Sequence, residues 1–266
     1  MPYKVIQAYW VWPTTQEIRS PAAVYCSGGA KLFAGSLEVG FAAALHVRVE
    51  RLSTRQDACR VAYVSDIHLR RGRSDRLVEQ VLEGVHRCQS NVVLLGGDLI
   101  DNSSELSSLK RLIGELAAYG PVLAVGGNHD SRVGMDAVRG AVVNGGGEWI
   151  HDRRVDISHG ARVVSVSGPD ACGEPVGDVR VLCAHNPRIW KRTHGDGYDL
   201  VLAGHLHGCQ FVAFEYRDRL FPGAVFYPYN MLSCQSGATR LVVSRGVSDL
   251  IPIRWRCPRE VVLCHV

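Results

Sequence analysis

The chain has 266 residues, enough for one large domain or two small ones, and 46% of them are hydrophobic, which supports a sizeable core. The net charge of +4 permits an anionic substrate. It does not indicate a nucleic-acid partner, which would require a concentrated basic face, and we expect none.

The cysteine pattern and the hydropathy of the chain argue against structural zinc-binding, disulfide-rich and membrane-spanning classes of protein. The nine cysteines are an odd number and form no Cys-x-x-Cys pair, which argues against a structural zinc site and against a secreted disulfide scaffold. The best candidate for a membrane helix, residues 22–45, is broken by Lys31, Glu38 and several glycines, so no segment reaches about 20 apolar residues. We expect no signal peptide, because the first residues contain no basic region that leads into an apolar core. We therefore expect free thiols and a cytoplasmic protein, with peripheral membrane contact as an alternative.

The start of the chain is its least informative part. Residues 1–45 are predicted to be an N-terminal extension to a single domain of residues 46–266. An aromatic cluster in the extension packs on the body of the protein, is loosely ordered, or lies at a membrane interface. Residues 45–52 alternate between apolar and polar side chains, which predicts a strand at a sheet edge. The aromatic cluster consists of Tyr3, Tyr9, Trp10 and Trp12.

Strands and helices then alternate. Apolar runs predict buried strands at residues 60–64, 91–95 and 121–125. Helical spacing predicts helices over residues 75–88, 106–116 and 132–143. The second helix follows a capping-box spacing from Asn102 to Glu105 and stops at Gly120-Pro121.

The second half of the chain is predicted to be mostly strands. Residues 149–157 and 161–167 suggest a hairpin, and residues 211–229 are rich in aromatic and turn residues. Alternating strands and helices followed by strands predict an α/β domain with two packed β-sheets flanked by helices. The further strands are expected at residues 179–184, 200–203, 240–245 and 260–265.

Metal-capable side chains directly follow five predicted strands. Because ligands bind beyond the carboxyl ends of strands in α/β sheets, these side chains are expected to meet at one site. Mixed oxygen and nitrogen donors suit manganese, iron or zinc, and they are too many for one tetrahedral zinc ion. Two ions about 3.5–4 Å apart are typical of phosphate ester hydrolysis. The side chains are Asp66 and His68, Asp98, Asn128 and His129, His185, and His205 and His207.

The order of these motifs resembles that of the calcineurin-like metallophosphoesterases, over roughly residues 58–266. His185-Asn-Pro187 and the tail of the chain look most like the subgroup typified by the YkuE phosphoesterase and the chlamydial-type UDP-2,3-diacylglucosamine pyrophosphatase. One departure is Gly208-Cys209-Gln210, where the subgroup commonly has Gly-Gly-Gln, and we interpret Cys209 as a spectator. The motifs are Ser65-Asp-Ile-His-Leu69, Gly97-Asp-Leu-Ile-Asp101, Gly127-Asn-His-Asp130, Ala184-His-Asn-Pro187 and Gly204-His-Leu-His207, and the tail contains Val243-Ser-Arg-Gly246, Pro252-Ile-Arg254 and Cys257-Pro-Arg-Glu260.

The resemblance implies a role for each ligand. Asp98 would bridge two metal ions. His129 would face the phosphoryl group and protonate the leaving oxygen, and Asp130 would orient His129. The first metal would be held by Asp66, His68 and His207, and the second by Asn128, His185 and His205.

Basic and aromatic residues near the motifs leave two interpretations open. Arg70 and Arg71 follow the first motif, and Arg188 follows His185. They either contact a phosphate-bearing substrate or form solvated loops. The aromatic residues of 211–229 either belong to the core or line a lipid groove.

The resemblance implies a metal-dependent phosphohydrolase that cleaves a phosphoester or pyrophosphate bond with metal-activated hydroxide. Its cofactors would be two divalent ions, with Mn²⁺ preferred and Fe, Zn and Mg as alternatives. The substrate would be a phosphate-containing small molecule or a lipid-linked nucleotide, such as UDP-2,3-diacylglucosamine in lipid A synthesis. A general or cyclic-nucleotide phosphodiesterase and a non-catalytic metal-binding scaffold are the alternatives. We expect a monomer.

Overall fold

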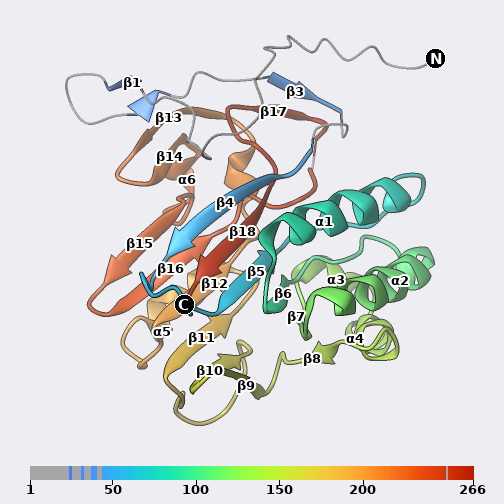
Figure 1. Ribbon diagram of the computed structural model, residues 1–266. Helices are drawn as coiled ribbons and strands as arrows, with labels where there is room; N and C mark the ends of the chain where they lie inside the picture. Colours follow the sequence, from blue (N-terminus) through green and yellow to red (C-terminus); the bar gives the residue numbers. More distant parts are fainter. Residues whose placement is uncertain (1–23, 26–30, 33–36, 41–43, 250) are drawn as a thin grey trace.

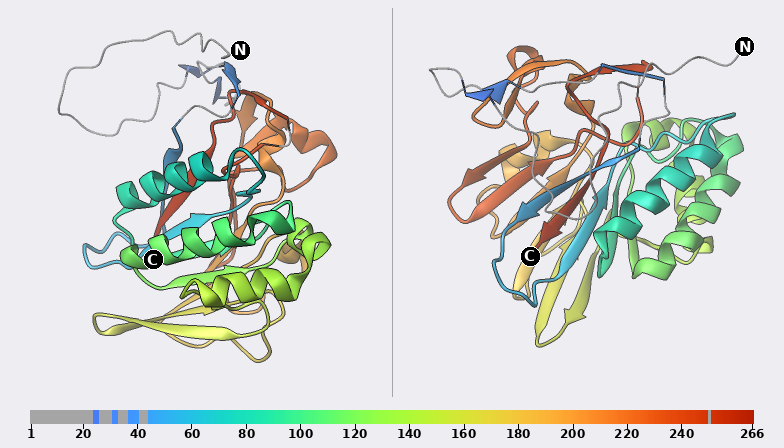
Figure 2. Two further views of the ribbon diagram at one scale, coloured as in Figure 1. Left: turned by 90° about the vertical axis from the view of Figure 1, so that its right-hand side faces the viewer. Right: turned by 45° about the horizontal axis from the view of Figure 1, so that its top comes forward.

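The computed structural model describes residues 24–25, 31–32, 37–40, 44–249 and 251–266 (Figure 1). The aromatic cluster expected near the N-terminus lies outside these residues. Two six-stranded sheets pack against each other, and helices cover the outer face of one of them (Figures 1 and 2). The predicted fold class, two packed sheets flanked by helices, is therefore confirmed.

The first sheet has the strand order β4-β18-β5-β6-β7-β8. Strands β5 to β8 are mutually parallel, and the buried strands predicted at residues 60–64, 91–95 and 121–125 are β5, β6 and β7. The alternating run near residue 46 forms the edge strand β4, which confirms its prediction. The bounds are β4 (His46–Arg51), β18 (Glu260–His265), β5 (Arg60–Val64), β6 (Val92–Gly96), β7 (Val122–Val125) and β8 (Glu148–Trp149).

Three amphipathic helices pack on the outer face of this sheet (Figure 1). They are α1 (Ser74–Cys88), α2 (Leu106–Leu116) and α4 (Met135–Asn144). The single helix expected over residues 132–143 is wrong, because Gly134 adopts a φ of 119° and separates α3 (Asn128–Val133) from α4. A glycine tolerates this backbone conformation without steric cost.

Short 3-10 turns flank α2. The side chain of Asn102 accepts a hydrogen bond from the backbone N–H of Ser104, so the expected helix start is capped by Asn102. The turn η1 (Ser103–Glu105) precedes α2, and η2 (Ala117–Tyr119) follows it.

The second sheet has the order β15-β16-β12-β11-β10-β9. Its inner face packs on the first sheet through an apolar layer that contains Tyr63, Leu94, Val181 and Leu202, all fully buried. The expected hairpin is formed by β9 and β10, but Trp149 belongs to β8 of the first sheet. The bounds are β15 (Ser233–Ser236), β16 (Thr239–Val243), β12 (Leu200–Ala203), β11 (Val179–Cys183), β10 (Arg162–Ser167) and β9 (Arg154–His159).

Two smaller sheets join the early part of the chain to its C-terminal half. Strand β3 (Leu37–Val39) pairs with β17 (Ile253–Trp255), and β2 (Lys31–Leu32) pairs with both β1 (Val24–Tyr25) and β13. The aromatic-rich segment after residue 210 forms β13 (Val212–Tyr216), β14 (Arg219–Pro222) and α6 (Gly223–Phe226). Three further short helices follow strands of the second sheet along the chain: η3 (Pro187–Ile189) and α5 (Trp190–Thr193) come after β11, and η4 (His207–Cys209) comes after β12.

A buried charge cluster links β18 to its surroundings. Glu260 accepts a hydrogen bond from Arg245 Nε at 2.9 Å and lies 3.1 Å from Arg48 Nη2. Burial alone would raise the pKa of Glu260, but Arg245 and Arg48 together lower it to about 2. The carboxylate is therefore held in its charged form across the neutral pH range.

The sequence predicted free cysteine thiols and no membrane-spanning helix, and the structure bears on both predictions. The cysteines of the described residues are free thiols, at positions 59, 88, 172, 183, 209, 234, 257 and 264. Within the described part of the chain, no helix combines the length and apolar character that a membrane crossing requires.

Candidate metal centre

The predicted ligands come together between the two sheets, where their strands end. Asp66 and His68 follow β5, and Asp98 follows β6. His185 follows β11, and His205 and His207 follow β12, so each sheet contributes. Three overlapping groups have ligand atoms that all lie within 4.8 Å of one another: Asp66, His68 and His207; His68, Asp98 and His129; and Asp98, His185 and His205.

The first group is buried and closely packed. His207 Nε2 lies 3.6 Å from Asp66 Oδ1, and the rings of His207 and His68 stack with their centroids 5.2 Å apart. His68 Nε2 is buried and has no hydrogen-bond partner among the described residues. A buried ring nitrogen without a partner is costly, and a cation between these side chains would satisfy it.

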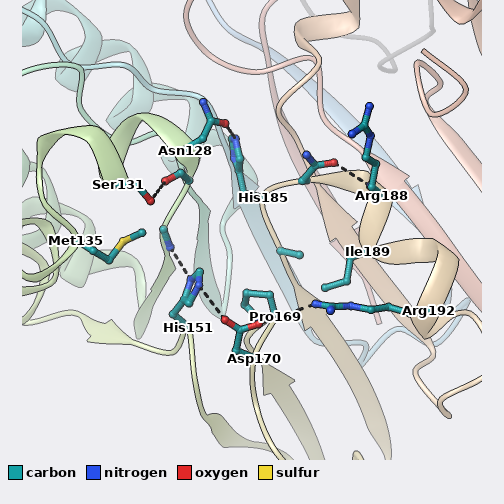
Figure 3. A pocket seen from close by; sticks show the side chains of 14 residues that line it. Asn128, Ser131, Met135, His151, Pro169, Asp170, His185, Arg188, Ile189 and Arg192 are labelled. Atoms are coloured by element: carbon teal, nitrogen blue, oxygen red, sulfur yellow. Dashed lines mark hydrogen bonds and ion pairs between the residues drawn. The ribbon is translucent and has the colours of Figure 1, made fainter. Parts of the chain in front are cut away.

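We call Asp66, His68 and His207 the first group, and Asn128, His185 and His205 the second group. The second group converges on His185 Nε2. This atom lies 3.2 Å from Asp98 Oδ2, 3.0 Å from His205 Nδ1 and 3.1 Å from Asn128 Oδ1 (Figure 3 shows the last contact). Four donor atoms of mixed nitrogen and oxygen type at these separations fit a divalent ion in their midst.

Asp98 lies between the two groups. Its Oδ2 is 3.2 Å from His185 Nε2 and 3.8 Å from His68 Nε2. Its Oδ1 accepts a hydrogen bond from the backbone N–H of His129 at 2.8 Å. One carboxylate thus faces the donors of both groups.

Hydrogen bonds at the outer ring nitrogens select the tautomers of three histidines. The Nδ1 atoms of His185 and His207 donate to the carbonyl oxygens of Gly96 and Ser248, at 2.9 and 3.0 Å. Because a carbonyl oxygen can only accept, Nδ1 carries the proton and Nε2 keeps its lone pair. His68 Nδ1 lies 2.6 Å from Asp101 Oδ1, which has the same effect. Such partners orient metal-binding histidines in general.

Asp101 is the functional residue that the sequence prediction missed. Its Oδ1 lies 2.6 Å from His68 Nδ1 and 2.8 Å from His129 Nδ1, and its Oδ2 lies 2.8 Å from Arg70 Nη2. The only signal in the sequence was a second carboxylate three positions after Asp98.

Asp130 occupies a different place from the one expected. We predicted that it would orient His129, but the side chain that contacts His129 Nδ1 is Asp101. The Asp130 carboxylate instead accepts hydrogen bonds from the backbone N–H groups of Gly127, Leu99 and Ile100. Asp130 therefore fixes the backbone beside Asp98, and its expected contact with His129 is wrong.

The backbone around the ligands is strained. Five ligand-bearing residues have φ in the left-handed region: Asp66 (57°), His68 (49°), Asp98 (52°), His205 (74°) and His207 (51°). Non-glycine residues adopt this conformation at a free-energy cost of about 1–3 kcal/mol each, and they cluster at functional sites. The surrounding fold therefore holds these side chains where unstrained loops would not place them.

Two glycines allow the chain to pass close to the carboxylates. A Cβ on Gly204 would lie 2.4 Å from Asp66 Oδ2, and a Cβ on Gly127 would lie 2.2 Å from Asp98 Oδ1. Both distances are shorter than real Cβ contacts, so only glycine fits at these positions.

The electrostatics of the site favour charged carboxylates. Burial opposes ionisation, yet the neighbouring histidines lower the pKa of both Asp66 and Asp98. Burial would likewise lower the pKa of His185, but the carboxylates of Asp98 and Asp66 raise it to about 9. Burial lowers the pKa of His207 to about 4. A divalent ion would take the place of the proton on His185.

Of the expected substrate contacts, two lie at the site and one does not. Arg70 is joined to it through Asp101. Arg188 lines two grooves that open at the second group, one of about 510 Å³ and one of about 120 Å³. Arg71 is exposed, and among the described residues no contact joins it to the ligands.

Cys209 lies next to this site in the chain. Burial raises the pKa of the Cys209 thiol to about 11, so the thiol stays protonated at neutral pH. It is therefore a poor nucleophile, which agrees with our interpretation of Cys209 as a spectator.

Comparison with known proteins identifies the family. Residues 59–209 match the family model described as calcineurin-like phosphoesterase. The phosphodiesterase YaeI of Escherichia coli is 25% identical over 226 residues, which cover 78% of this chain and 82% of that one. The protein YpbG of Bacillus subtilis is 26% identical over 165 residues, or 56% of this chain and 61% of that one. An uncharacterized metallophosphoesterase of Helicobacter pylori is 26% identical over 225 residues, or 76% of this chain. The match spans 58% of the Helicobacter pylori protein.

Solved structures add a weaker likeness. The protein TT1561 of Thermus thermophilus aligns with a TM-score of 0.48 at 11% identity, over 72% of this chain and 91% of that one. Because this TM-score is below 0.5, the assignment rests on the match in sequence, which spans more than half of the chain. By that match, the chain belongs to the calcineurin-like phosphoesterase family.

Proposed function

We propose that the protein is a hydrolase of phosphodiester or pyrophosphate bonds that works with two divalent metal ions. The observation that carries this proposal is the set of three ligand groups that overlap through His68 and Asp98. An arrangement in which one carboxylate faces two separate donor groups suits a pair of ions better than a single one. The donors mix imidazole, carboxylate and amide, which suits manganese, iron or zinc, and Mn²⁺ is the ion we expect among them.

Each ligand has a proposed place. Asp98 would contact both ions, because its Oδ2 faces His185 Nε2 and His68 Nε2. When bound, such a pair neutralises the phosphoryl oxygens and supplies an activated water. The first ion would be held by Asp66, His68 and His207, and the second by Asn128, His185 and His205.

His129 is proposed as the residue that moves a proton. Its Nδ1 contacts Asp101, which leaves its Nε2 available for a reacting group. Asp101 Oδ1 accepts a hydrogen bond from Nδ1 and so orients the ring. In its doubly protonated form, His129 can deliver the Nε2 proton to the leaving oxygen.

The finer proposal concerns the substrate, which we infer to be a lipid-linked nucleotide such as UDP-2,3-diacylglucosamine. It is supported by an apolar surface beside His205. The smaller groove is lined by Leu206, Tyr227, Pro228 and Tyr229, and the neighbouring side chains of Val225 and Phe226 are 68% and 76% exposed. Exposed apolar side chains at the mouth of a polar site suit a ligand that carries acyl chains. A general or cyclic-nucleotide phosphodiesterase is the competing proposal.

Metal-dependent turnover of bis-p-nitrophenyl phosphate tests the general proposal. We expect hydrolysis with Mn²⁺, and its loss in Asp98→Ala and His129→Ala. His159→Ala, which changes a histidine of β9 outside the three groups, should keep the parent rate. No turnover by the parent protein with Mn²⁺, Zn²⁺, Mg²⁺ or Fe²⁺ would favour a non-catalytic metal-binding scaffold.

Product analysis tests the finer proposal. UDP-2,3-diacylglucosamine and a cyclic nucleotide are incubated separately with the Mn²⁺-loaded protein. Release of UMP from the first, without cleavage of the second, supports the lipid-linked substrate. Cleavage of the cyclic nucleotide alone would refute it.

A further inference from the structure

The larger of the two grooves has no role in the proposed chemistry. It begins at Asn128 and His185 and has a volume of about 510 Å³. Figure 3 shows Met135 on one side of it and Arg192 on the other, with Asp170 at the end away from Asn128 and His185. The groove therefore has room for a substituent attached to a phosphate at the second ligand group.

The far end of the groove offers hydrogen-bonding groups that the protein leaves largely open. Asp170 Oδ2 lies 3.5 Å from His151 Nε2, and Asp170 Oδ1 lies 3.9 Å from Arg192 Nη2. Both distances exceed a normal hydrogen bond. The side chains of Asp170 and Arg192 are 63% and 69% exposed. The carboxylate can accept, and the guanidinium can donate, hydrogen bonds to a ligand.

His151 is held in one tautomer beside them. Its Nδ1 accepts a hydrogen bond from the backbone N–H of Gly126 at 3.2 Å, so Nε2 carries the proton. Its ring stacks on that of Trp149, with the centroids 6.0 Å apart. His151 thus presents a fixed donor to the same end of the groove.

The walls of the groove are apolar. Met135, Pro169 and Ile189 line it between the ligand pair and the polar end. A ring with apolar faces and hydroxyl groups at its edge, such as a sugar, matches this combination of surfaces. The opposite charges of Asp170 and Arg192 offset each other at the far end, so the polar end favours an uncharged, hydroxylated group.

We propose that this groove binds a sugar or nucleoside esterified to the scissile phosphate. Asp170 accepts hydrogen bonds from its hydroxyl groups, and Arg192 and His151 donate to them. The inference rests on the proposed hydrolase activity and names the class of substituent that its substrate carries.

The test compares two substrates of the Mn²⁺-loaded protein. Uridine 5′-(p-nitrophenyl phosphate) carries a nucleoside, whereas bis-p-nitrophenyl phosphate has no hydroxyl groups. Asp170→Ala and Arg192→Met should each lower kcat/KM for the uridine ester about tenfold, mainly through KM, because each removes a hydrogen bond to a charged group. Turnover of bis-p-nitrophenyl phosphate should not change. Asp57→Ala removes a similarly exposed carboxylate (66%) outside the groove, and it should change the turnover of neither substrate.

Equal effects of the groove variants on both substrates, or no effect on either, would overturn the inference. Calorimetric binding of UMP to the Mn²⁺-loaded protein decides it without any turnover. Affinity about tenfold weaker in Asp170→Ala supports the groove, and unchanged affinity overturns it. If the parent protein hydrolyses neither ester, that result counts against the hydrolase proposal alone.

Discussion

Replacement of Asp101 by asparagine tests how the protein prepares its candidate ligands. The Asp101 carboxylate accepts hydrogen bonds from His68 Nδ1 at 2.6 Å and His129 Nδ1 at 2.8 Å, and it pairs with Arg70. Asparagine keeps the shape of the side chain but loses the charge. If its oxygen faces the two rings, its amide NH₂ group is forced against the guanidinium of Arg70. If it faces the other way, the NH₂ group drives both rings into the tautomer that lacks the Nε2 lone pair.

The magnitude follows from these two bonds. A hydrogen bond to a charged group contributes about 1.5–3 kcal/mol, and a neutral acceptor about half as much. Loss of the charge at both bonds therefore costs about 1.5–3 kcal/mol, which corresponds to roughly 10- to 150-fold in metal affinity or in kcat/KM. This range agrees with the usual effect of changing a partner of a metal-binding histidine, about 10- to 100-fold.

The assay is Mn²⁺-dependent hydrolysis of bis-p-nitrophenyl phosphate, titrated with metal, together with the metal content of the purified protein. Asp199→Asn is the matched control, because Asp199 also accepts several hydrogen bonds and is 30% exposed, against 20% for Asp101. It lies at the opposite end of β12 and should change neither quantity. Parent-like activity and metal affinity in Asp101→Asn would refute the reasoning.

Three further outcomes are expected. His205→Ala and His207→Ala should each lose one of two metal equivalents, and two full equivalents in both would contradict the proposed assignment. Gly204→Ala places a Cβ 2.4 Å from a candidate ligand carboxylate and should abolish activity, whereas Gly140→Ala, whose Cβ meets nothing within 4 Å, should retain it. The pKa of Glu260 is lowered from 4.5 to about 2, so its contribution to stability is present above pH 4.5 and is lost as the pH falls toward 2. The free energy of unfolding, measured with urea, should fall by about 3 kcal/mol between pH 4.5 and pH 2, and it should fall by less in Glu260→Gln. An equal fall in both proteins would contradict this explanation.

The sequence predicted most of the site because each ligand directly follows an apolar strand. A short apolar run such as residues 200–203, bounded by turn residues, favours a buried strand, and the polar residue after it then lies at the strand's carboxyl end. The bridging position of Asp98 came from the family resemblance, and the structure supports it with contacts to both donor groups.

The role of Asp101 could not be predicted, because its partners are set by tertiary structure. It contacts His68 across 33 residues and His129 across 28, and neither separation leaves a local pattern. The same limit applies to strand order: β18 lies between β4 and β5 although most of the chain separates it from both in sequence. Trp149 was assigned to the hairpin for the same reason. It belongs to β8, whose pairing with β7 joins it to Ala124, far away in the sequence.

The division of the ligands between the two sheets has a consequence for stability. Asp66, His68 and Asp98 come from the first sheet, whereas His185, His205 and His207 come from the second, and every bound ion would join one sheet to the other. Because the ions would bind the folded state and not the unfolded chain, their binding free energy would stabilise the packing of one sheet on the other. Chelation would weaken the sandwich at the ligand-bearing edge first, while the apolar layer between the sheets continues to hold the opposite end.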